Sequence, residues 1–159
     1  MASTVKVDVS YSQLAVYASA LQQPFNDWTD RHVAQGFAWR LGSVSFRTMV
    51  EDGSHLVEID ITDHVGAIHP DAVRVIDTPF EVPEDGKIEI GSIYDAVTLS
   101  LPAGSFLLRC EFLQTAGGDG ERVHLTFARK DAPRFAVVRA DESLSTNGEL
   151  LTTAHAAPG

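Results

Sequence analysis

Short hydrophobic runs with two-residue alternation fill most of this chain, and turn-forming residues separate them. The clearest runs cover residues 5–11, 43–50, 55–61 and 105–113. Because successive side chains of a strand point to opposite faces, each run predicts a strand with one buried face. Short strands at regular spacing predict an all-β fold, and we expect an antiparallel β-sandwich of about ten strands in two sheets.

One stretch departs from this pattern and predicts a single short helix over residues 29–35. Thr29 is a favourable N-cap, because its hydroxyl can accept a hydrogen bond from a free amide of the first turn. Gly36 supplies the left-handed residue that commonly ends a helix. Trp28 precedes this helix and Trp39 follows it, so both tryptophans also fit a purely structural role, holding the helix against a sheet.

The chain has 159 residues, enough for one domain with a substantial core, which we expect to span residues 1–140. From Asp141 onward small and polar residues dominate, which predicts a flexible C-terminal tail over residues 141–159. Within the domain, the acidic turns at 51–54 and 84–86 predict two hairpins. Two short strands, 73–76 and 80–82, are predicted on either side of Pro79.

The acidic residues are concentrated in one segment. The formal net charge is −10, and residues 51–95 contain twelve Asp and Glu against only Arg74 and Lys87. Since affinity for phosphate backbones requires cationic groups, this balance argues against direct nucleic-acid binding and favours a basic partner. No hydrophobic run is long enough to span a membrane. Cys110 is the only cysteine, so no internal disulfide can form, and we expect a bacterial cytoplasmic protein.

Several chemical sites can be weighed from residue spacing. His64 and His69, with Asp63 and Asp71, match no established zinc spacing, so we interpret them as a polar loop. The acidic pairs Glu51–Asp52 and Glu84–Asp85 could bind calcium only if their turns lay together. Cys110 falls on the hydrophobic face of its strand, and neither a nucleophile elbow nor a phosphate-binding loop is present. We therefore expect no enzyme, no catalytic residue, no metal site and no cofactor.

A family resemblance appears in a series of short motifs. They begin with Ser10-Tyr11 and Asp27-Trp28-Thr29-Asp30 and continue through 36–38, 42–46, 80–82, 86–90, 92–93 and 99–104 to Cys110. In order and spacing these motifs resemble the ComJ family over roughly residues 9–113. The segment 61–77 is longer than the family pattern, and the segment after Arg139 is additional. Proteins of this family inhibit NucA-type DNA-entry nucleases, and relatives act as immunity proteins beside nuclease toxins.

The resemblance implies a NucA-like DNase as partner, and charge suggests how it is bound. A nuclease cleft must be cationic, so an acidic surface can enter it after electrostatically steered association. We expect the interface to comprise an aromatic patch and the acidic groups of the turns and outward strand faces: Asp27, Trp28, Asp30, Glu51, Asp52, Glu58, Asp60, Glu84, Asp85 and Glu89. Aromatic anchors ringed by polar groups are typical of protein interfaces.

Two questions stay open at this level. The target can be a competence nuclease or a secreted toxin, and the oligomeric state is not determined. The alternative from another class is a calcium- or carbohydrate-binding β-sandwich module, which would gain thermal stability from its ligand.

Overall fold

The computed structural model describes residues 2–114, 120–146 and 148–158 of the chain. These residues form eleven strands and one helix. A six-stranded sheet has the order β1 (Ala2–Val9), β5 (Gly53–Thr62), β10 (Glu121–Arg129), β9 (Gly104–Leu113), β6 (Ala72–Val82) and β11 (Ala136–Arg139). A five-stranded sheet has the order β3 (Phe37–Arg40), β4 (Ser43–Arg47), β2 (Gln13–Ala18), β7 (Lys87–Gly91) and β8 (Ala96–Ser100).

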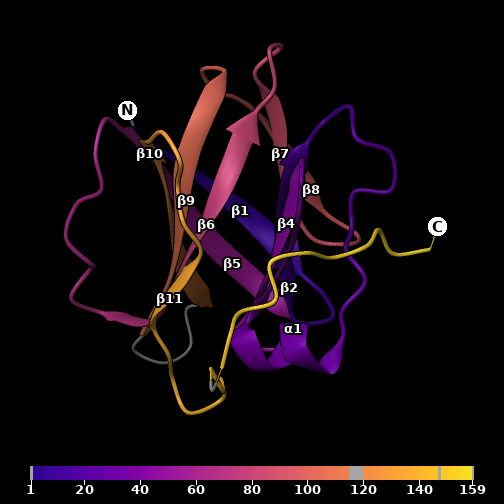
Figure 1. Cartoon of the computed structure of the whole chain (residues 1–159), viewed down its shortest axis with the longest axis vertical. Coiled ribbons are helices and arrows are strands. Elements are labelled where there is room, and N and C mark those ends of the chain that lie inside the picture. The colour runs from indigo at the N-terminus through magenta and orange to yellow at the C-terminus, as the bar shows by residue number, and fades with distance from the viewer. Residues whose placement is uncertain (1, 115–119, 147, 159) are drawn as a thin grey trace.

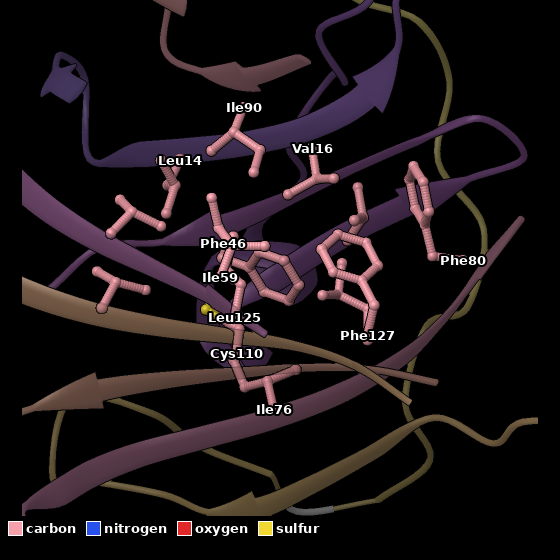
Figure 2. Close-up of a cluster of buried hydrophobic side chains, with 14 of the residues drawn as sticks. Leu14, Val16, Phe46, Ile59, Ile76, Phe80, Ile90, Cys110, Leu125 and Phe127 are labelled. Carbon is pink, nitrogen blue, oxygen red and sulfur yellow. The ribbon is translucent and has the colours of Figure 1, made fainter. Parts of the chain in front are cut away.

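The two sheets face one another and enclose the core, as the alternation predicts. Figure 2 shows Leu14, Phe46 and Ile90 of the smaller sheet pointing toward Leu125 and Phe127 of the larger one. All of these side chains are fully buried. Cys110 lies in the same layer, where burial raises the pKa of its thiol well above the ordinary value. The β-sandwich prediction is therefore confirmed, although the pairing of β5 with β10 is parallel.

The two acidic turns are not hairpins, in contrast to the sequence prediction. β4 belongs to the smaller sheet and β5 to the larger one, so residues 48–52 cross between the sheets. Residues 83–86, between β6 and β7, cross in the same way. Alternation specifies that each strand has one hydrophobic face, but two such strands can pair edge to edge or pack face to face. Here the consecutive strands belong to different sheets at both turns.

The predicted strands at 73–76 and 80–82 form one continuous strand, β6, that runs through Pro79. Pro79 is tolerated because the edge of β6 that faces β11 forms no ladder at this residue, so no N–H is needed there. Its carbonyl oxygen accepts a hydrogen bond from Trp39 Nε1 at 2.7 Å, and the ladder with β11 covers only Val75 to Asp77. A residue's N–H and C=O point to the same side of a strand, so the missing N–H breaks no ladder bond there.

The helix α1 (Asp30–Gln35) has the predicted caps. Thr29 is the N-cap and His32 Nδ1 reaches back to the Thr29 amide at 2.9 Å. Gly36 ends the helix with φ of 90°. A Cβ at Gly36 would also lie 3.0 Å from Ile76 Cδ1, so the position needs glycine both for its backbone conformation and for space.

The described residues of the C-terminal segment, which starts at Asp141, contact the rest of the domain. Leu144 is buried in the main core, and Gln35 exchanges two hydrogen bonds with the backbone of Leu151. Farther along, the Asp27 amide donates to His155 O at 2.7 Å. In Figure 1 this yellow segment crosses the purple region of α1 and β4. Its composition resembles a loop, but its backbone satisfies polar groups of α1 that would otherwise be buried without partners.

Candidate partner-binding surface

The sandwich has two ends of different character. The first carries α1, the β1–β2 turn, the β4–β5 crossover and the β7–β8 turn, and we call it the helix end. Hydrogen bonds join three of these elements: Ser12 N donates to Glu51 O at 2.7 Å, and Ser10 N donates to Ser92 Oγ at 2.9 Å. The opposite end carries the β6–β7 crossover and the β8–β9 turn, and we call it the far end. Figure 1 shows α1 at the bottom and the β6–β7 crossover at the top.

Five of the ten predicted interface residues lie at the helix end. Asp27 and Asp30 flank Trp28 at the start of α1 and are exposed. Glu51 and Asp52 are exposed on the β4–β5 crossover. Trp28 is half-buried, and its ring lies edge-on to that of His32, with centroids 6.4 Å apart. Trp28 can therefore both hold α1 against the sheet and present part of its ring to a partner.

Two predicted residues lie at the far end. Glu84 and Asp85 are exposed there, and Asp85 Oδ1 accepts from the Lys87 amide at 3.0 Å. The eleven-residue strand β6 starts on the side of the helix end and finishes at the far end, and at about 3.3 Å per residue it is about 36 Å long. The two acidic pairs therefore cannot ligate one calcium ion, since its ligands lie within about 2.6 Å of it.

The remaining three lie on the outer sheet faces, where each has a neighbour. Glu58 Oε1 is 3.8 Å from Arg122 Nη2, and Asp60 Oδ2 is 2.6 Å from His124 Nε2. Glu89 accepts a hydrogen bond from the Tyr17 hydroxyl at 3.4 Å. Burial, together with the charge and hydrogen bond of Glu89, raises the pKa of Tyr17 to about 12. These carboxylates are thus less available to a partner than those at the two ends.

Sequence reasoning missed two aromatic residues at the helix end. Tyr11 in the β1–β2 turn and Tyr94 in the β7–β8 turn are exposed, and their ring centroids are 6.4 Å apart. A hollow of about 380 Å³ lies beside Tyr11, lined by Ser12, Gln13, Trp28, Val33 and Arg47. The sequence signal that could have identified Tyr11 and Tyr94 is a large aromatic residue in a turn, where Asn, Gly and Asp are favoured.

The histidines of the β5–β6 loop occupy separate positions. His69 Nδ1 accepts from the Asp71 amide at 3.0 Å, whereas His64 lines a different hollow beside His124 and Arg109. Across residues 2–114, 120–146 and 148–158, no group of three or more His, Cys, Asp or Glu side chains is arranged to hold a metal ion. Within the same residues, no helix is long and hydrophobic enough to cross a membrane.

Comparison with known proteins gives two matches. The profile of the family described as Competence protein J (ComJ) matches residues 6–128. Among solved structures, the chain is similar to that described as the crystal structure of ComJ, inhibitor of the DNA degrading activity of NucA, from Bacillus subtilis. The two are 22% identical with a TM-score of 0.66, and the match covers 79% of this chain and 94% of the other. No curated protein matches the chain.

Proposed function

The chain belongs to the ComJ family, and on that premise we propose that it is a protein inhibitor of a NucA-type DNA-degrading nuclease. The observation that carries the proposal is the family match over residues 6–128, which includes the second half of β1, all of β2 to β9 and nearly all of β10. The similar fold belongs to a protein described as an inhibitor of the DNA-degrading activity of NucA. This protein then acts by binding and carries out no catalysis itself.

The charge of the molecule supports the same function. A formal net charge of −10 repels DNA and attracts the cationic cleft with which a nuclease holds its substrate. Long-range attraction of this kind speeds association and weakens as salt is added. An inhibitor seated on the cleft excludes DNA both by its volume and by its charge. We place this function in the bacterial cytoplasm, with which the free, buried thiol of Cys110 is compatible.

The test is a plasmid-degradation assay with a purified NucA-type nuclease, titrated with this protein. We expect cleavage to stop at near-equimolar inhibitor, and the inhibition to weaken as salt concentration rises. A preparation of the same protein unfolded by heat controls for contaminants that bind the plasmid. Full cleavage in the presence of a large molar excess of folded protein would contradict the proposed function.

Each end of the sandwich carries exposed acidic residues, so either end is a candidate for the surface that contacts the nuclease. A partner docked on the helix end reaches Asp27, Trp28, Asp30, Glu51 and Asp52, whereas one docked on the far end reaches Glu84 and Asp85. The double charge reversals Glu51→Lys/Asp52→Lys and Glu84→Lys/Asp85→Lys change the net charge by the same amount. Whichever pair slows association more in a stopped-flow or biosensor measurement therefore identifies the docking end.

A further inference from the structure

Tyr11 occupies a backbone conformation that is unfavourable for tyrosine. The β1–β2 turn contains Tyr11 with φ of 56° and Ser12 with φ of 59°, and Ser10 pairs with Gln13 across it. Turns with two left-handed central residues strongly favour Asn and Gly, and a bulky residue there is a steric outlier. Such strain lowers stability and is concentrated at functional sites.

Burial does not compensate for this strain. Tyr11 is 63% exposed, and its aromatic neighbour Tyr94 is 76% exposed. A tyrosine that is both strained and exposed contributes little to folding. Its side chain is therefore explained better by a contact outside the domain than by a contact within it.

Hydrogen bonds join the two turns that carry these tyrosines. Ser92 is buried between their turns, and its hydroxyl accepts from Ser10 N at 2.9 Å and donates to Gln13 O at 2.8 Å. The turn that carries Tyr94 is closed by the Ser92 amide donating to Asp95 O at 2.7 Å. Because the backbones of both turns are tied together before any partner arrives, binding through these rings loses little conformational entropy.

The hollow beside Tyr11 can receive a side chain from a partner. Val33 of α1 is partly exposed on its wall, and Trp28 forms another part of it. Trp28 Nε1 is buried and has no hydrogen-bond partner among the residues that the structure describes, so the indole ring, not its N–H, is what this residue offers to the hollow. Arg47 is the one cationic residue of the lining, and its Nη1 already donates to Val33 O and Ser143 O.

The surroundings of the hollow favour a cation. Asp8, Glu51 and Asp52 are exposed around the β1–β2 turn, and Asp95 holds the Asp8 amide at 2.8 Å. Aromatic faces next to carboxylates attract Arg and Lys side chains by cation–π and charge interactions. The predicted acidic groups on the outer sheet faces have neighbours of their own. At the far end, no exposed aromatic residue accompanies Glu84 and Asp85 within the described part of the chain.

We propose that the helix end is the docking surface for the nuclease, with Tyr11 and Tyr94 as its anchors. The occupant is the basic rim of the DNA-binding cleft, and one of its Arg or Lys side chains enters the hollow between Tyr11 and Trp28. This inference rests on the proposed function, which it makes specific to one surface.

The test compares Tyr11→Asn and the double variant Tyr11→Asn/Tyr94→Ser with the parent protein, by inhibition of plasmid cleavage and by equilibrium affinity for the NucA-type nuclease. Asn suits the left-handed turn, so the melting temperature of Tyr11→Asn is expected to stay equal or to rise. Affinity is expected to fall at least about 10-fold for the single variant and further for the double one. Leu41→Asn is the matched control: Leu41 is 73% exposed, lies at the far end between β3 and β4, and is expected to leave affinity unchanged.

The outcomes separate the two proposals. If the parent protein does not inhibit the nuclease, the proposed function fails and the nuclease is not the occupant. If the parent inhibits and the double variant inhibits equally well, the helix end is not the docking surface, although the proposed function stands. A loss of affinity accompanied by an equal loss for Leu41→Asn would also overturn the surface assignment.

Discussion

Replacing Asp141 by Ala should destabilise the protein markedly, although Asp141 lies in the segment that the sequence predicts to be a tail. Arg74 is 1% exposed, and its guanidinium binds the Asp141 carboxylate through two hydrogen bonds of 2.7 and 3.0 Å. Removing one partner of a buried ion pair leaves an uncompensated charge and typically costs about 3–5 kcal/mol. Arg74 keeps its hydrogen bond to Arg47 O at 2.6 Å and its contact with the Phe112 ring, which favours the lower limit.

We therefore expect Asp141→Ala to lower the free energy of unfolding by about 3 kcal/mol, measured by urea denaturation. For a chain of this size, that loss lowers the melting temperature by about 6–12 °C. Glu142→Ala is the matched control, because Glu142 is adjacent, exposed and of the same charge. The double variant Arg74→Met/Asp141→Ala should be more stable than Asp141→Ala alone, since it contains no unpaired buried charge.

The pH dependence provides a second check on the same pair. Burial by itself raises the pKa of Asp141, but the hydrogen bond and charge of Arg74, with the amides of Asp141 and Ser143, outweigh it and lower the pKa. A lowered pKa means that the carboxylate stabilises the folded state above the unfolded pKa, about 4, and that this contribution is lost as pH falls further. The difference between parent and Asp141→Ala should shrink below pH 4. Equal melting temperatures for Asp141→Ala and Glu142→Ala at neutral pH would refute the reasoning.

Three further perturbations follow from the structure. Because the pKa of Tyr17 is raised to about 12, the folded state holds this proton more tightly, and the resulting stability is complete below pH 10 and lost between pH 10 and 12. Thermal denaturation of Tyr17→Phe should lack this alkaline loss. Gly86→Ala would place a Cβ 2.4 Å from Leu101 O, at a residue whose φ is 71°. It should lower the free energy of unfolding by about 2 kcal/mol or more, measured by urea denaturation. Gly66→Ala is the control and should be neutral, because no atom lies within 4 Å of the added Cβ. Ending the chain after residue 140 should cost about 2 kcal/mol more than Asp141→Ala, because the buried Leu144 is lost as well; equal denaturation midpoints would argue against a stabilising role for this segment.

Local features of the sequence predict the elements well. Thr29 and Gly36 specify both ends of α1, because a cap acts on backbone groups within one turn of helix. The alternation over residues 105–113 identifies β9 and its buried face, because side-chain direction in a strand depends only on position. The wrong predictions are the strand break at Pro79 and the hairpins at the two acidic turns. At each of these places the structure depends on neighbours from distant segments of the chain.

The candidate surface illustrates the same division. Trp28, Glu51 and Asp52 were identifiable from residue type and charge, yet the proximity of Tyr11 to Tyr94 was not, because these residues are far apart in the chain. Their meeting depends on which strands the two turns connect. The location of Glu51 and Glu84 at opposite ends likewise depends on the directions of the strands and on the crossovers between sheets, which residue type alone does not predict.

The sequence by itself determined the β class, the helix with its caps, the acidic character and, through its motifs, the family. These properties depend on single residues or on short spacings, so they can be read without knowledge of the contacts. Only the tertiary structure decided that the acidic pairs lie at opposite ends, that the C-terminal segment covers α1, and that Tyr11 and Tyr94 share one surface with Trp28. The physical reason is that strand pairing and burial are collective: a hydrophobic face specifies that it must be covered, but not which segment covers it.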